Sequence, residues 1–155
     1  MINRNIMKSL VAYYSRTNIT KKLAEDIAKN TDADIEQIKP KNDYEGKLGY
    51  VRAGKDAMSE KIIDLEELKY DPADYDMVYL GVPVWVSKAA NPMITYLKMN
   101  EGKFNNVKFF ITAGSSGFDS TVEQMEKYSA KPEKTLTLTT KQVKKNEYTL
   151  EGFTD

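Results

Sequence analysis

The sequence alternates between short, continuously apolar segments and segments whose apolar residues recur at helical spacing, and this alternation restricts the fold more than any other feature. The clearest apolar segments are residues 7–14, 76–82 and 107–113. After the first of them, Ile19, Leu23 and Ile27 recur every four residues, which is typical of one face of a helix. Strands that are apolar throughout are buried on both sides. The pattern therefore predicts a parallel sheet with helices on both faces.

The remaining segments complete an alternating order of strands and helices. Two weaker strands are predicted, at residues 35–39 and 136–138. Five parallel strands joined by right-handed helical connections suit a doubly wound α/β fold with the strand order 2-1-3-4-5. Helices are predicted at residues 18–30, at 46–61, from 91 onward, from 119 or 120 onward, and at 148–155.

Individual residues set the expected ends and faces of these elements. Pro83 cannot donate a backbone hydrogen bond and is expected to stop the strand that precedes it. Asp119 or Ser120 is expected to cap the helix that begins there. In the segment 46–61 we expect four apolar side chains to face inward, namely Leu48, Val51, Ala57 and Met58.

Length and charge limit the domain count and the classes of partner. The 155 residues leave room for one domain, which we assign to residues 7–155, with residues 1–6 as an N-terminal extension. The 23 basic residues balance the 23 acidic ones, so no net charge draws the chain to nucleic acid. The basic residues are nearly all Lys, whereas base recognition favours Arg. We expect no nucleic-acid partner.

Two missing residue types exclude whole classes of chemistry. Without Cys the chain cannot form a disulfide, a thiolate nucleophile or an iron–sulfur cluster. Without His it has no imidazole base and no imidazole metal ligand, and no loop has carboxylate spacing for a hard cation, so we expect no metal. The apolar segments are too short to span a membrane, and we expect a soluble, cytoplasmic protein. Redox or group-transfer work would require a bound cofactor.

The loop after the first strand is a candidate phosphate site. Residues 15–20 carry three hydroxyls and one Asn side chain immediately before a predicted helix. The free amides and the positive dipole end of a helix start bind anions, and hydroxyl donors add to this. The alternative is that Thr17 or Asn18 simply caps the helix.

Two further loops follow the next apolar strands. Trp85, which is the single Trp, comes just after the strand 76–82, where it could cover a planar ligand or pack in the core. Residues 113–118 offer small side chains and free backbone amides. The carboxyl ends of parallel strands share one edge of the sheet, so the three loops meet there. A phosphate site, an aromatic wall and an amide-rich edge are what flavin mononucleotide (FMN) requires.

Three segments carry a resemblance to a known family. The segments YYSRTNIT (13–20), DYDMVYLGVPVW (74–85) and FFITAGSSG (109–117) resemble the three FMN loops of the flavodoxin family, and GYVRAG (49–54) resembles its short flavodoxin-like members. The likeness extends from about residue 7 to residue 148. The family's phosphate loop usually reads S-x-T-G-N-T, and this chain has Asn18 in place of Gly and Ile19 in place of Asn. Asn tolerates a positive φ, so we expect the turn to survive.

The resemblance implies a set of cofactor-binding residues. The phosphate would be held by the side chains of Ser15, Thr17, Asn18 and Thr20 with the amides of Arg16 and Ile19. The flavin ring would be lined by Pro83, Val84, Trp85, Val86 and Ser87, with Ala113, Gly114, Ser115 and Gly117 along its other edge. Because Val86 is β-branched, a positive φ at that position would be strained.

The resemblance also implies a function, with alternatives. A flavodoxin is an FMN-dependent electron carrier that shuttles electrons between redox partner proteins. One alternative is a flavodoxin-like NAD(P)H:quinone or flavin oxidoreductase, and another is a flavin-free interaction domain. The carrier is favoured because no acid, base or nucleophile constellation accompanies the loops.

The charge distribution suggests where a partner docks. Residues 64–76 contain six acids against Lys69 alone. One interpretation is that this acidic stretch approaches the flavin and steers a basic redox partner. The other is that it forms a solvated face without a partner.

Overall fold

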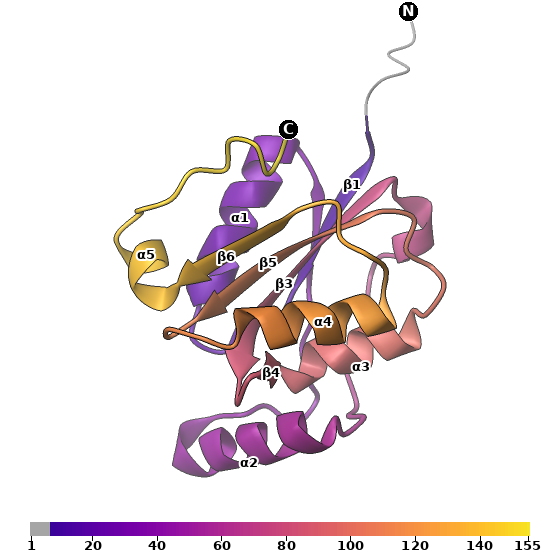
Figure 1. The fold of residues 1–155 in the computed structure, drawn as a ribbon. Helices are drawn as coiled ribbons and strands as arrows, with labels where there is room; N and C mark the ends of the chain where they lie inside the picture. The colour runs from indigo at the N-terminus through magenta and orange to yellow at the C-terminus, as the bar shows by residue number, and fades with distance from the viewer. Residues whose placement is uncertain (1–6) are drawn as a thin grey trace, which may run out of the picture.

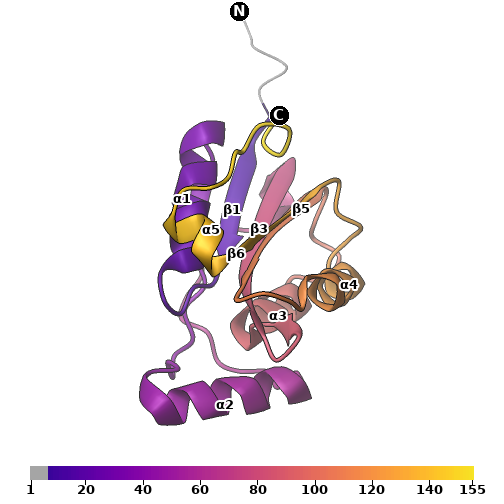
Figure 2. The same ribbon diagram turned by 60° about the vertical axis from the view of Figure 1, so that its left-hand side comes forward.

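The sheet has five parallel strands in the order β2-β1-β3-β5-β6, with helices on both faces (Figures 1 and 2). This arrangement is seen in a computed structural model that describes residues 7–155; the predicted extension 1–6 lies outside the described residues. A short strand, β4, pairs antiparallel with the end of β3. The predicted fold class and strand order are confirmed. The strands are β1 (Ser9–Tyr13), β2 (Asp34–Gln37), β3 (Met77–Trp85), β4 (Lys88–Ala89), β5 (Val107–Ala113) and β6 (Thr135–Thr139).

The helices form one layer on each face of the sheet, and a further helix lies over the carboxyl ends of the strands. Figure 2 shows α1 and α5 on one side of the sheet and α3 and α4 on the other, while α2 lies beyond the carboxyl ends of the strands. The bounds are α1 (Ile19–Thr31), α2 (Gly46–Ser59), α3 (Asn91–Met99), α4 (Phe118–Tyr128) and α5 (Thr140–Lys144), with one 3-10 turn at Pro72–Asp74.

Both faces of the central strands are buried, which explains why these strands are apolar throughout. On one face, Val78 and Phe109 belong to the core that includes Met93 of α3. On the other face, Tyr79 and Phe110 pack with Leu23 of α1. Successive side chains of a strand point to opposite faces, so two cores require an unbroken apolar run.

The strand β3 does not stop at Pro83, contrary to our expectation, but continues to Trp85. The neighbouring strand β1 pairs with β3 only as far as Gly81. Beyond that point the short antiparallel segment that contains β4 replaces β1 beside β3, and Pro83 lies at this change of neighbour, where Pro is tolerated. The carbonyl of Pro83 still accepts a bond from the amide of Ala90, with N and O 3.0 Å apart.

The helix α2 was predicted at the right place but with the wrong face inward. Three of the side chains expected to face inward are exposed, with exposed fractions of 87% for Leu48, 68% for Val51 and 62% for Met58. Only Ala57 of the predicted set is buried. The helix packs over an edge of the sheet rather than on a face, and its contact side is made of small residues together with Asp56. The apolar stripe therefore points away from the protein.

Two predicted helix ends are also corrected. The residue that caps α4 is Gly117, at φ 93 and without a side-chain cap, so Asp119 and Ser120 lie inside the first turn. Residues 148–155 form no helix; they run as an extended tail with a turn, after the short helix α5. The chain therefore covers one face of the sheet with a tail where we expected a last helix.

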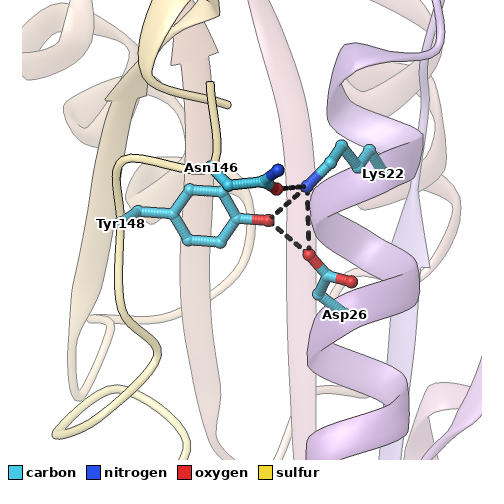
Figure 3. A network of polar contacts seen from close by, with 4 residues as sticks. All are labelled: Lys22, Asp26, Asn146 and Tyr148. Atoms are coloured by element: carbon cyan, nitrogen blue, oxygen red, sulfur yellow. Dashed lines mark hydrogen bonds and ion pairs between the residues drawn. The ribbon is translucent and has the colours of Figure 1, made fainter. Parts of the chain in front are cut away.

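Polar contacts fix this tail on α1 (Figure 3). The ammonium of Lys22 donates to Asn146 Oδ1 at 2.5 Å and to the Tyr148 hydroxyl at 2.9 Å. The same hydroxyl donates to Asp26, which also forms an ion pair with Lys22 at 3.4 Å. Four side chains from two segments distant in sequence thus form one network, which holds the tail beside α1.

Candidate functional site

A cavity of about 330 Å³ lies at the carboxyl edge of the sheet, between the strand ends and α2. Its volume is in the range of small-molecule sites. It is the location at which the sequence predicted the three loops to meet. The lining residues are Arg16, Thr17, Ile19, Thr20, Tyr50, Ala53, Gly54, Pro83, Val84, Trp85, Val86, Thr112, Ala113, Gly114 and Thr140.

The first loop leaves the start of α1 open. Asn18 occupies the cap position at φ 68, and its side chain makes no capping hydrogen bond. The first intrahelical bond runs from the amide of Lys22 to the carbonyl of Asn18, so the amides before it have no helical partner. The Oγ of Ser15 is buried and has no hydrogen-bond partner among the described residues. Free amides and an unpaired hydroxyl at a positive helix end suit an anion.

A buried pair of hydroxyls joins this loop to the sheet. The Oγ1 atoms of Thr20 and Thr112 are 2.9 Å apart, which links α1 to β5. Both residues line the cavity. This bond fixes the floor of the cavity between the first and third loops.

The second loop is a tight hairpin between β3 and β4. Trp85 pairs with Lys88, and the two residues between them, Val86 and Ser87, have φ values of 51° and 60°. Positive φ at both central residues defines a type I′ turn, which matches the twist of the two strands. The usual sequence of this turn is Asn-Gly. Val86 thus adopts the left-handed conformation that is strained for a β-branched residue.

Trp85 packs against neighbouring aromatic side chains and also reaches the cavity. Its half-buried ring makes edge contacts with Tyr14 (centroids 5.4 Å apart, rings at 88°) and with Tyr44 (5.2 Å, 78°). It also lines the cavity. Two perpendicular neighbours fix the orientation of the indole, so the wall that it presents to a ligand is rigid.

The third loop is held against the second by close packing. A side chain at Gly117 would lie 2.7 Å from Val84 Cγ1, so only Gly fits there. The hydroxyl of Ser120 donates to the carbonyl of Ser87 at 2.6 Å. Gly114, in contrast, faces open space at the cavity. The hairpin and the start of α4 therefore form one unit.

Most of the predicted site residues line the cavity, and the others lie beside it. Ser15, Asn18, Ser87, Ser115 and Gly117 do not line it, although Ser15 and Gly117 support it as described above. The sequence analysis missed the lining residues Tyr50, Ala53, Gly54, Thr112 and Thr140. Thr112 could have been found as a polar residue within a buried apolar strand, and the first three lie within or next to the segment that resembled the family.

Arg16 is the single charged residue among those lining the cavity. Beside the cavity, burial and a hydrogen bond to Asp56 raise the pKa of Tyr44 well above its ordinary value. The Tyr44 hydroxyl therefore stays protonated and donates to Asp56 Oδ2 at 2.7 Å. Among the described residues that line the cavity the charge is thus positive, which favours an anionic ligand.

A match to a family model shows which protein family the chain belongs to. The family model for flavodoxin matches residues 8–148 of the chain. The chain belongs to the flavodoxin family.

Solved structures with the same fold include flavoproteins. A flavoprotein from Lactobacillus acidophilus, in complex with FMN, has 22% identity and a TM-score of 0.73, covering 92% of this chain and 99% of that one. A flavoprotein from Bacteroides uniformis has 24% identity and a TM-score of 0.72, with coverages of 91% and 97%. An NADH:FMN oxidoreductase in its apo form is more distant, with 14% identity, a TM-score of 0.53, and coverages of 90% and 79%. No curated protein matches the chain.

The loop that resembles the family's phosphate loop has the expected turn, with Asn18 in place of Gly. Asn18 adopts φ 68, as its tolerance of left-handed conformations predicted. Within residues 7–155 no group of three or more metal-ligating side chains is found. No helix of that same region is long and apolar enough to cross a membrane.

The acidic stretch 64–76 runs between the two edges of the sheet. Asp64 lies beside Lys41, after β2, where the main chains of these two residues are hydrogen-bonded. Asp76 lies at the amino end of β3 and accepts a bond from the amide of Lys8. One end of the stretch therefore lies near the carboxyl edge of the sheet and the other at the edge opposite the cavity.

Proposed function

We propose that the protein binds FMN in this cavity and acts as an electron carrier between redox partner proteins. The observation that supports this most strongly is the open start of α1 beside the unpaired Oγ of Ser15, within a chain of the flavodoxin family. A phosphate would satisfy both the free amides and this hydroxyl. FMN supplies the redox chemistry at its ring when it is bound.

The other lining residues fit the remaining parts of FMN. The ring of Trp85 and the side chain of Val86 offer an apolar wall, and Gly114 leaves room for a flat ring at the third loop. Tyr50 of α2 adds a second aromatic side chain to the lining. The cavity is thus polar at one end and apolar at the other, as a phosphorylated flavin requires.

A carrier is favoured over an oxidoreductase because the cavity offers no acid–base pair. Among residues 7–155, no Asp, Glu or Lys lines it. The alternative is an FMN-dependent NAD(P)H:quinone or flavin oxidoreductase. The NADH:FMN oxidoreductase that shares the fold at 14% identity is an enzyme of this kind. A purified carrier oxidises NAD(P)H only when a partner reductase is added, whereas an oxidoreductase does so alone.

The decisive test compares FMN with riboflavin, which lacks the phosphate. Each ligand is titrated into apoprotein and the quenching of flavin fluorescence is followed. Hydrogen bonds to a charged group contribute about 1.5–3 kcal/mol each, so the loss of two or more should weaken binding at least about 100-fold. Equal dissociation constants for the two ligands would refute the phosphate site.

A matched pair of variants assigns the effect to the first loop. Ser15→Ala removes the unpaired hydroxyl and should weaken FMN but not riboflavin. Ser129→Ala removes a hydroxyl at the other end of α4, where it donates to the carbonyl of Met125, and should leave both affinities unchanged. If both variants behave alike, the hydroxyl of Ser15 has no special role.

A further inference from the structure

Arg16 belongs to the first loop, but its side chain does not turn toward the start of α1. Its Nε donates to the carbonyl of Tyr44 at 2.8 Å, and one terminal nitrogen donates to the carbonyl of Gly46 at 3.2 Å. The guanidinium also lies over the ring of Tyr50, 5.6 Å from its centroid. All three contacts are to the beginning of α2 or the residues just before it.

Besides Arg16, the packing of its small residues and the ring of Tyr44 against Trp85 place α2 over the cavity. It lies beyond the sheet in both ribbon views, away from the two helical layers (Figures 1 and 2). Asp56 accepts a bond from Tyr44, and a side chain at Gly54 would come within 3.2 Å of Val86. These contacts join α2 and the segment before it to the β3–β4 hairpin, whereas Arg16 joins the first turn of α2 to the loop after β1.

The segment before α2 is held by a second Arg, from the helix itself. Arg52 donates to the carbonyls of Asn42 and Asp43, at 3.0 and 2.7 Å. This links the helix to its own preceding segment and not to the rest of the protein. Arg16 thus provides the link between that unit and the phosphate loop.

We propose that Arg16 is a positioning residue that holds α2 over the cavity. The inference rests on the proposed binding of FMN and assigns to the Arg16 side chain a role other than contact with the phosphate. The same loop would hold the phosphate and the first turn of α2. Order in this loop and the position of α2 over the cavity should therefore stabilise each other. Loss of the guanidinium should free α2 and speed the escape of the whole flavin.

The test separates positioning from charge by using two ligands. In Arg16→Met, we expect the dissociation rates of FMN and of riboflavin to rise by about the same factor, on the order of 10-fold. A cation that acted on the phosphate would affect FMN alone. Dissociation is followed by fluorescence after dilution of the complex.

A second measurement needs no ligand. In apoprotein, trypsin should cleave Arg16→Met faster than wild type after Lys47, Arg52 and Lys55, because α2 opens more often. Mass spectrometry identifies the cut sites. Unchanged cleavage within α2 would overturn the proposal even if the flavin affinity falls.

Two control variants complete the design. Arg16→Lys keeps the charge but lacks the planar fork, so it should resemble Arg16→Met and serves if the Met variant fails to fold. Lys21→Met removes one charge from the first turn of α1. In the described region Lys21 has no hydrogen bond or ion pair with α2, so the dissociation rates of this variant should match wild type.

If Lys21→Met has the same effect as Arg16→Met, or if only FMN is affected, the role of Arg16 is electrostatic and the proposal is wrong. If wild type binds neither flavin, the proposed function fails, while the trypsin comparison still tests the hold on α2.

Discussion

Val86 is the residue beside the cavity whose backbone conformation suits its side chain least. Its φ of 51 places a β-branched residue in the left-handed region, and its side chain is 56% exposed. Strain of this kind amounts to about 1–3 kcal/mol. We expect Val86→Asn to raise the free energy of unfolding by about 1 kcal/mol, because Asn tolerates this region.

Urea unfolding of apoprotein measures the change. Val51→Asn is the matched control, because Val51 is likewise exposed but lies in the regular helix α2. It should change stability by no more than a few tenths of a kcal/mol, since the two residues have similar helix propensities. Equal effects at both positions would show that the hairpin is not strained.

Gly117 combines a positive φ with a close neighbour. At φ 93, a Cβ would stand 2.7 Å from Val84 Cγ1 and 3.2 Å from Ser87 Cα. We expect Gly117→Ala to destabilise the protein by about 2–4 kcal/mol, because overpacking adds about 1–3 kcal/mol to the backbone penalty. Gly102→Ala isolates the backbone penalty, since Gly102 has φ 81 and nothing within 4 Å. Thermal or urea unfolding of the two variants should differ by the packing contribution, and identical losses would contradict it.

At the scale of the elements, the tail after α5 replaces a helix on one face of the sheet. Phe153 is 5% exposed and packs edge-on against Tyr79, with the centroids 5.6 Å apart. The buried ammonium of Lys108 donates to the carbonyl of Phe153 at 2.6 Å. A segment without regular structure is thus fixed by one aromatic side chain and one buried cation.

Phe153→Ala should therefore cost about 3–5 kcal/mol of stability, the usual value for truncating a buried Phe. The FMN affinity of the folded variant should not change, because Phe153 packs on the amino half of the sheet, away from the cavity. Phe104→Ala, at a half-buried Phe beside α3, provides a comparison and should cost less. A loss of FMN affinity in Phe153→Ala would mean that the tail and the cavity are coupled.

The elements that could be predicted from the sequence are those whose pattern reflects burial on a sheet. The strand β5 was found at its observed limits because every residue in it is buried. The helix α2 was found but turned the wrong way, since its contact side consists of Gly49, Ala53 and Ala57 and no apolar pattern marks it. The hairpin at Val86 could not be predicted, because a β-branched residue argues against the turn that the surrounding structure imposes.

The candidate site was predictable to the extent that its residues follow strands. The lining residues from the loops after β1, β3 and β5 were all expected, because parallel strands present their carboxyl ends at one edge. Tyr50 and Ala53 were not, because the contribution of α2 depends on where a helix beyond the sheet settles. That position is set by contacts such as Arg16 to Gly46, which sequence spacing does not reveal.

At the scale of the whole molecule, buried tyrosines should control stability in alkali. Burial raises the pKa of Tyr13 to about 12, with a further contribution from Glu25, and it raises the pKa of Tyr96 as well. These groups ionise first in the unfolded chain, near pH 10, so stability is retained below pH 10 and lost as the pH rises through the raised values. For Tyr13 the loss is about 2–3 kcal/mol.

Urea unfolding between pH 8 and pH 12, with tyrosinate absorbance as the second signal, tests this expectation. Lys108 opposes the trend, because burial and Lys134 lower its pKa, but it is one group against several tyrosines. Tyr96→Phe should reduce the alkaline loss at little cost near pH 7, since the Tyr96 hydroxyl is buried without a partner among the described residues. Stability that stays constant to pH 12 would contradict the assignment.

The position of the carboxyl terminus has a practical consequence. The carbonyl of Asp155 is 3.3 Å from Lys108 Nζ, near the first residue of β5, whereas Ala113, the last residue of that strand, lines the cavity. Five residues of strand separate these ends by roughly 17 Å. A linker attached at residue 155 therefore leaves from the edge of the sheet opposite the cavity (Figure 1). A partner protein fused there would leave the mouth of the cavity accessible, which suits an assay of the proposed electron transfer.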